Sequence, residues 1–142
     1  MKDNCRLHAV EVLLKQAPRV MPTILIIDDD AITAKLYREF LERSQFNVEV
    51  YADGAVALER LEADGADALV VDLMMPKMNG FEFMKHVRAM DRYKTTPMLA
   101  YTTAYIPQLV NQAKEAGATE VYDKTKLNGQ LLKTALQQFL II

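Results

Sequence analysis

The stretch that decides the fold is Asp67–Gly80, which reads Asp-Ala-Leu-Val-Val-Asp-Leu-Met-Met-Pro-Lys-Met-Asn-Gly. Its continuous apolar run, Leu69–Val71, is typical of a strand that is buried on both faces of a parallel sheet. Asp72 ends the run, and the Met-Pro and Asn-Gly pairs that follow indicate a tight loop. Ligands of open α/β sheets bind beside the carboxyl ends of strands, so Asp72 is placed for function. A solvated aspartate at a strand end is the alternative for this residue taken alone.

The composition is that of a single ordinary domain. The chain has 142 residues, 51% of them apolar, which suffices for one full core. The net charge of −2 gives no indication of binding to nucleic acid or to a membrane. Cys5 is the only cysteine, which excludes an internal disulfide and a cysteine metal site. Because neither a membrane span nor a signal-peptide core is present, we expect a cytoplasmic protein.

Residues 1–22 are predicted to form an N-terminal helical extension before a domain that spans residues 23–142. Apolar residues recur there at helical spacing, and Pro18 ends the pattern. They are Leu7, Val10, Leu13, Leu14 and Ala17. We expect this helix to dock on the domain or on a partner. The alternative is that Met21 and Pro22 are the real start and that the extension is incidental.

Strands and helices alternate five times along the rest of the chain. The predicted strands are Thr23–Ile27, Val48–Tyr51, the run that ends at Asp72, Pro97–Tyr101 and Glu120–Asp123. Short connections between them predict an α/β fold, with a doubly wound parallel sheet covered on both faces.

The helices of this pattern have recognisable ends and faces. Asp30 and Asp53 are expected to cap helices, and Gly117 is expected to end one. The first helix is expected to bury one apolar face, made of Ile32, Leu36, Tyr37, Phe40 and Leu41. The last is expected to use Leu131, Leu132, Ala135, Leu136, Phe139 and Leu140.

Polar residues stand at the ends of four strands: Asp28 and Asp29, Asp72, Thr102, and Lys124. These ends share one edge of a doubly wound sheet, so the side chains are expected to meet there. Three adjacent carboxylates need a cation to be ionised together, and a few oxygen ligands suit Mg²⁺. An ionised carboxylate beside a metal can attack phosphorus, while the metal, an ammonium and a hydroxyl share the phosphoryl charge. Each residue alone is more often solvated or structural, but the ordered set indicates phosphoryl chemistry.

From about Met21 to Leu140 the sequence resembles the receiver domain of two-component response regulators. The resemblance rests on the Asp72 stretch and on three further motifs. These are Ile-Leu-Ile-Ile-Asp-Asp-Asp (24–30), Pro-Met-Leu-Ala-Tyr-Thr-Thr-Ala (97–104) and Gly-Ala-Thr-Glu-Val-Tyr-Asp-Lys (117–124). It implies a flavodoxin-like, five-stranded sheet of strand order 2-1-3-4-5.

The resemblance also implies the role of each site residue. Asp72 would accept a phosphoryl group from a sensor histidine kinase or a phosphotransfer protein. Thr102 would bond one phosphoryl oxygen, and Lys124 would pair with another. The implied Mg²⁺ ligands are Asp28, Asp29, Asp72 and the backbone carbonyl of Met74.

The sequence departs from the family pattern beside the site. Thr125 follows Lys124 where the family usually has proline, and Val121 occupies the usual aromatic switch position. These changes leave the phosphorylation chemistry intact but alter the usual relay from threonine to aromatic residue. Met74 and Ala104 stand where family side chains flank the water that attacks the phosphoryl group. Neither can orient a water, so slow loss of the phosphoryl group is expected.

The expected function is signalling through contacts with a downstream protein or a homodimer, without nucleic acid and without enzymatic action on a separate substrate. Because the sequence ends after its fifth helix, we expect no DNA-binding domain. The apolar tail, residues 139–142, or the N-terminal helix is the expected docking surface. Two alternatives stay open: the N-terminal receiver of a longer regulator, and an aspartyl-phosphate phosphohydrolase. The second is less favoured because such enzymes carry an Asp-x-Asp nucleophile after their first strand.

Overall fold

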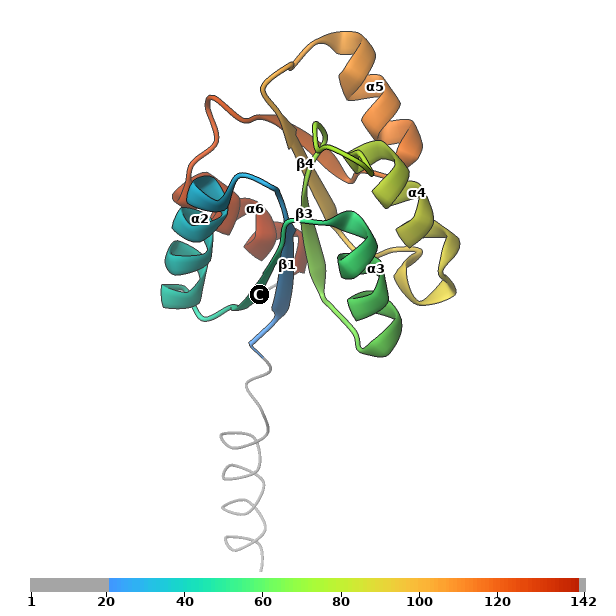
Figure 1. Cartoon of the computed structure of the whole chain (residues 1–142). Coiled ribbons are helices and arrows are strands. Elements are labelled where there is room, and N and C mark those ends of the chain that lie inside the picture. Colours follow the sequence, from blue (N-terminus) through green and yellow to red (C-terminus); the bar gives the residue numbers. More distant parts are fainter. Residues whose placement is uncertain (1–20, 141–142) are drawn as a thin grey trace, which may run out of the picture.

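One five-stranded parallel sheet forms the centre of the domain, with the strand order β2-β1-β3-β4-β5 (Figure 1). The computed structural model describes residues 21–140. The strands are β1 (Thr23–Ile27), β2 (Asn47–Tyr51), β3 (Ala68–Asp72), β4 (Met98–Thr102) and β5 (Glu120–Asp123). The predicted fold class and strand order are therefore confirmed. The predicted helix within residues 1–22 and the end of the apolar tail lie outside the described residues.

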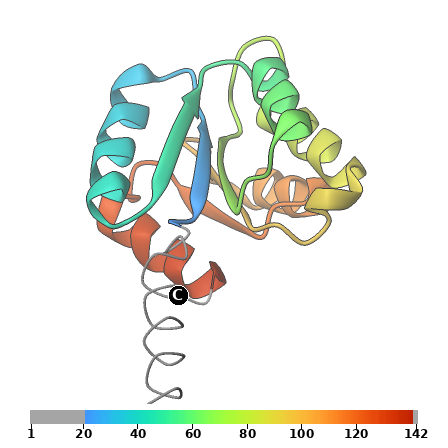
Figure 2. The ribbon, with the colours of Figure 1, turned by 90° about the horizontal axis from the view of Figure 1, so that it is seen from below.

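Helices cover both faces of the sheet (Figures 1 and 2). On one face lie α2 (Ala31–Arg43) and α6 (Gly129–Leu140). On the other lie α3 (Gly54–Ala63), α4 (Gly80–Ala89) and α5 (Pro107–Ala116). A short 3₁₀ helix, η1 (Asp91–Tyr93), follows α4 and was not expected from the sequence.

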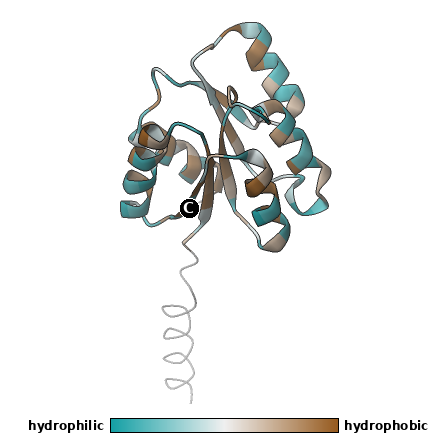
Figure 3. Cartoon of the chain, viewed as in Figure 1, coloured by the Kyte–Doolittle hydropathy of each residue, from teal (hydrophilic) through white to brown (hydrophobic). Residues whose placement is uncertain are grey.

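Each face of the sheet has its own hydrophobic core, because successive strand residues point to opposite sides. In β1, Leu25 and Ile27 pack with α3 and α4, while Ile24 and Ile26 pack with α2 and α6. Figure 3 shows the apolar colour concentrated on the strands and the polar colour on the outer surfaces of the helices. All five residues of β3 are buried, as the run before Asp72 predicts.

The helix ends follow the sequence signals. The Asp30 carboxylate accepts bonds from the N–H groups of Ile32 and Thr33, and Asp53 accepts one from Ala55. Helix α5 ends at Gly117, whose φ of 118° is in the left-handed region that favours glycine. The predicted caps at Asp30 and Asp53 and the predicted end at Gly117 are confirmed.

The predicted apolar face of α2 is partly wrong. Tyr37 and Leu41 are buried, but Ile32 is 75% exposed and Leu36 is 61% exposed. The helix instead turns Ala34 to the sheet, because residues 34, 37 and 41 share one face and the small alanine permits close packing. In α6, Leu131 is likewise exposed rather than buried.

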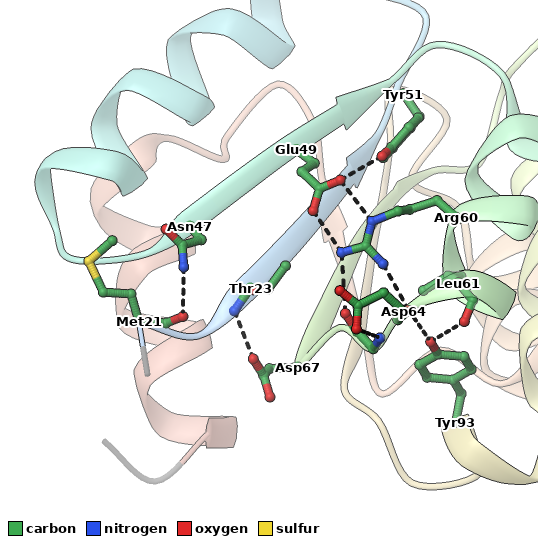
Figure 4. Close-up of polar contacts among 11 residues, drawn as sticks. Met21, Thr23, Asn47, Glu49, Tyr51, Arg60, Leu61, Asp64, Asp67 and Tyr93 are labelled. Carbon is green, nitrogen blue, oxygen red and sulfur yellow. Dashed lines mark hydrogen bonds and ion pairs between the residues drawn. The ribbon is translucent and has the colours of Figure 1, made fainter. Parts of the chain in front are cut away.

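Polar contacts tie the strands at the edge of the sheet remote from Asp72 (Figure 4). The Arg60 guanidinium on α3 donates to both Glu49 carboxylate oxygens on β2, at 2.9 and 2.8 Å. The backbone N–H of Thr23 donates to Asp67 at 2.7 Å. The first contact joins α3 to β2, and the second joins the start of β1 to the residue before β3.

Candidate functional site

The polar residues predicted from the sequence gather at the carboxyl edge of the sheet, where the loops into α2, α4 and α5 begin (upper edge in Figure 1). Asp28 follows β1, while Asp72 and Thr102 are the last residues of β3 and β4. Lys124 follows β5, and its backbone N–H donates to the Thr102 carbonyl at 2.9 Å. The sheet therefore places residues from four strand ends around one point.

Three carboxylates form the centre of the site. One oxygen from each of Asp28, Asp29 and Asp72 lies within 4.8 Å of the others. Asp28 is 1% exposed and Asp72 is 4% exposed, whereas Asp29 faces solvent. This all-oxygen set, open on one side, fits a hard divalent cation that keeps several of its waters.

Lys124 supplies the positive charge of the site. Its Nζ lies 3.3 Å from Asp72 Oδ2 and 3.4 Å from Asp28 Oδ2, and its side chain is only 14% exposed. Burial opposes the charge, but the carboxylates of Asp28 and Asp72 outweigh it and raise the pKa of Lys124. The ammonium therefore stays charged while it contacts both carboxylates.

The Asp72 carboxyl holds its proton more tightly than an ordinary aspartate. Burial raises its pKa to about 6, and the neighbouring Asp28 adds to the rise. The Met74 N–H, 3.1 Å from Asp72 Oδ1, and the Lys124 ammonium act in the opposite direction. A divalent cation beside these carboxylates would favour the ionised form, which is the nucleophilic one.

Both oxygens of Asp28 are held by protein donors. Oδ1 accepts from the Asp30 N–H at 2.9 Å, and Oδ2 accepts from the hydroxyl of Tyr101. Tyr101 is fully buried in β4. Burial and the negative charge of Asp28 raise the pKa of Tyr101, which keeps the phenol a donor. The sequence did not point to Tyr101, because its place opposite Asp72 in the sheet register is seen only in the folded structure.

The hydroxyl predicted to meet a phosphoryl group, that of Thr102, belongs to a fully buried residue. Its Oγ1 accepts a bond from the Ala104 N–H at 3.1 Å, which shapes the loop after β4. Thr103 is exposed, and Met74 is 55% exposed. The functions of Thr102 and of the Met74 carbonyl stay predictions.

The two departures from the family pattern occupy different surroundings. Val121, which stands at the usual aromatic position, is an aliphatic residue buried in the core that α3, α4 and α5 cover. The Thr125 N–H and hydroxyl bond to Asp123 Oδ1 at 3.0 and 2.7 Å. No peptide bond within residues 21–140 is cis, so the bond between Lys124 and Thr125 is trans.

Comparison with known sequences assigns the chain to a family. The family described as the response regulator receiver domain matches residues 24–136. This match covers most of the chain and includes all the polar residues of the site. The chain belongs to the response regulator receiver domain family.

Solved structures and curated relatives agree with this assignment. The chemotaxis protein CheY4 of Vibrio cholerae superposes with a TM-score of 0.80 at 35% identity, over 84% of this chain and 99% of that one. The transcriptional regulatory protein CpxR of Escherichia coli is 42% identical over 82 residues, 58% of this chain and 34% of CpxR. A protein-glutamate methylesterase/protein-glutamine glutaminase of Anaeromyxobacter dehalogenans is 32% identical over 75% of this chain and 30% of that protein. The chain thus spans about a third of the length of these two relatives. Across residues 21–140, no helix has the length and apolar character needed to cross a membrane.

Proposed function

We propose that this chain is a phosphoacceptor domain in which Asp72 takes a phosphoryl group from a sensor histidine kinase or a phosphotransfer protein. The observation that carries the proposal is the contact of a partly buried ammonium, Lys124, with the buried carboxylate of Asp72 inside a cluster of three carboxylates. We propose that Mg²⁺ binds there to Asp29 and Asp72, to the Met74 carbonyl and, through water, to Asp28. When bound, Mg²⁺ would supply positive charge to the phosphoryl oxygens.

In the proposed transfer, an Asp72 carboxylate oxygen attacks phosphorus, and the bond from phosphorus to the donor's histidine nitrogen breaks. The electron pair of that bond stays on the nitrogen, which takes up one proton from solvent to become the neutral imidazole of histidine. Lys124 already lies against the Asp72 oxygen and pairs with a phosphoryl oxygen after transfer. The Thr102 hydroxyl donates to another phosphoryl oxygen, for which it must turn its hydrogen toward the site.

The phosphorylated domain is proposed to act in the cytoplasm through contacts with a downstream protein or with a second copy of the chain. The nearly neutral charge of −2 supports a protein partner over DNA. An aspartyl-phosphate phosphohydrolase is not favoured. Such enzymes carry their nucleophile after the first strand, whereas the proposed acceptor here, Asp72, ends β3. Receiver domains occur alone, as the match to CheY4 illustrates, and within longer proteins such as CpxR. The proposal therefore concerns the domain itself.

Acetyl phosphate tests the proposed function directly, because it can donate a phosphoryl group without the partner kinase. With Mg²⁺, intact-mass spectrometry should show the addition of one phosphoryl group, and EDTA should prevent it. The product should be lost on treatment with hydroxylamine, which cleaves acyl phosphates. A protein that gains no mass under these conditions would contradict the proposal.

Asp29 and Thr102 should differ in their effect on the metal. Asp29 is the exposed carboxylate of the cluster, and Asp28 already accepts two protein hydrogen bonds, so Asp29 is the better placed direct ligand. Asp29→Ala should weaken Mg²⁺ binding about tenfold or more, as expected for loss of a ligand or its close support. Thr102→Ala should leave Mg²⁺ binding unchanged, because the Thr102 hydroxyl is proposed to contact the phosphoryl group and not the cation. Calorimetric titration without phosphate measures both, and equal losses would contradict the assignment.

The phosphoryl group on Asp72 should be lost more slowly than is usual for receiver domains. Hydrolysis needs a water held in line with phosphorus, and the side chains of Met74 and Ala104 offer it no hydrogen bond. Met74→Asn and Ala104→Glu should each shorten the half-life, measured by mass after acetyl phosphate is removed. Met74→Leu is the matched control, since it changes an exposed apolar side chain without adding a polar group. A wild-type decay as fast as that of both polar variants would overturn the argument.

A further inference from the structure

Tyr101, next to Thr102, makes a hydrogen bond that has no role in the phosphotransfer proposed above. Tyr101 is fully buried, and its hydroxyl donates to Oδ2 of Asp28 across the carboxyl edge of the sheet. A buried hydroxyl needs a partner, and a carboxylate is among the strongest acceptors. Here the partner is a member of the candidate metal cluster, so the hydrogen bond joins β4 directly to the metal site.

The ring of Tyr101 is held in place on two sides. The Tyr37 ring from α2 meets it edge to face, with centroids 6.0 Å apart and planes at 81°. The Lys124 Nζ lies 5.2 Å from its centroid. With the ring fixed by these contacts, its hydroxyl has one defined direction. The fixed phenol therefore restrains the orientation of the Asp28 carboxylate, instead of turning with that carboxylate.

The same hydroxyl also limits how strongly Asp28 competes for Lys124. The ammonium lies between two carboxylates, 3.4 Å from Asp28 Oδ2 and 3.3 Å from Asp72 Oδ2, with the exposed Asp30 carboxylate farther away at 3.9 Å. Without the phenol, Asp28 Oδ2 would keep the ammonium as its only donor. A stronger pairing of Lys124 with Asp28 would hinder entry of a cation and draw the ammonium away from Asp72.

We propose that Tyr101 is a positioning residue for the metal site, which orients the Asp28 carboxylate toward the cation and keeps Lys124 shared between Asp28 and Asp72. This inference rests on the proposed function, because it assumes that Mg²⁺ binds at this cluster. It adds a hydrogen-bond donor behind Asp28, a carboxylate that is itself proposed to hold the cation through water, and removal of outer-shell partners typically changes metal affinity by about 10–100-fold.

The test compares two substitutions that each delete one hydroxyl from neighbouring rings. Tyr101→Phe keeps the ring and its contacts but removes the donor to Asp28. Tyr37→Phe is the matched control, because the Tyr37 hydroxyl bonds to the Leu127 carbonyl and not to the cluster. Calorimetric titration should show Mg²⁺ binding at least about tenfold weaker in Tyr101→Phe and unchanged in Tyr37→Phe. Thermal unfolding of both variants controls for the fold.

A double-substitution cycle separates positioning from a merely structural effect. If Tyr101 acts through Asp28, Tyr101→Phe should weaken Mg²⁺ binding much less in an Asp28→Asn background than in the wild type. The wild type supplies a readout that needs no variant: the Tyr101 hydroxyl proton should appear in NMR spectra as protected from exchange and should shift when Mg²⁺ is added. Equal Mg²⁺ affinities of wild type and Tyr101→Phe, or a Tyr101 hydroxyl that Mg²⁺ does not affect, would overturn the inference while the proposed function stands. A wild type that binds no Mg²⁺ would overturn both.

Discussion

Asp72→Asn is expected to abolish phosphorylation by acetyl phosphate in the presence of Mg²⁺, with no phosphoryl adduct in the intact mass. The substitution keeps the shape of the side chain but replaces the nucleophilic carboxylate oxygens by an amide, which does not attack phosphorus. The neighbouring carboxylates cannot substitute for it. Asp29 is expected to bind the cation directly and Asp28 through water, so both serve the metal in the proposed site.

Asp67→Asn is the matched control for this loss. Asp67 directly precedes the same strand, β3, and its carboxylate accepts the Thr23 N–H at the opposite edge of the sheet. The asparagine oxygen can still accept that bond, so phosphorylation of Asp67→Asn should equal that of the wild type. An adduct that persists in Asp72→Asn, or that disappears in Asp67→Asn, would contradict the placement of the acceptor.

Gly80→Ala is expected to cause the largest loss of stability among single-methyl changes near the site. A Cβ atom at Gly80 would lie 2.5 Å from the Asp72 carbonyl oxygen and 2.7 Å from the Leu73 Cα. Both are backbone atoms of the segment that carries the acceptor, so relief of the clash must move that segment. We expect the free energy of unfolding to fall by about 1–3 kcal/mol, the usual cost of overpacking, and phosphorylation by acetyl phosphate to slow.

Gly54→Ala tests whether the effect comes from the backbone clash and not from the alanine itself. A Cβ there would meet the Met78 side chain, with the sulfur at 3.2 Å, and a methionine can adjust its rotamer. Urea denaturation should therefore show a change of less than about 1 kcal/mol, since alanine also favours the helix. Similar losses in the two variants would show that the approach of Gly80 to Asp72 and Leu73 is not special.

Local signals in the sequence were sufficient to predict the helix ends and the central strand. Asp30, Asp53 and Gly117 each mark a helix end through chemistry that acts within a few residues, and the structure confirms all three. The buried run before Asp72 identifies the central strand, since only a strand covered on both faces is apolar throughout. The strand order could not be derived from such local signals and came from the family resemblance.

Contacts between distant elements were not predictable in the same way. The buried face of α2 depends on how close Ala34 can approach the sheet, so the larger Ile32 and Leu36 lie outside the contact. The Arg88 guanidinium on α4 donates to the carbonyls of Tyr93, Thr96 and Gly117. Those carbonyls come together only in the folded chain.

The site shows the same division. Asp28, Asp29, Asp72 and Lys124 follow from the order of strand ends, and the structure brings their side chains together. Tyr101 does not follow from it, because its hydrogen bond to Asp28 spans β4 and β1, which β3 separates. A tyrosine inside a buried strand is interpreted from sequence as a core residue, because the hydrogen-bond partner of its hydroxyl is known only from the structure.

The most direct test of the central claim is to locate the phosphoryl group chemically on the wild-type protein. Borohydride reduces an aspartyl phosphate to homoserine, which survives proteolysis and can be assigned by peptide mass spectrometry. After treatment with acetyl phosphate and Mg²⁺, followed by borohydride, homoserine is expected at position 72 and nowhere else. Homoserine at position 28 or 29, or its absence from a protein that carries a phosphoryl group, would contradict the assignment of Asp72 as the acceptor.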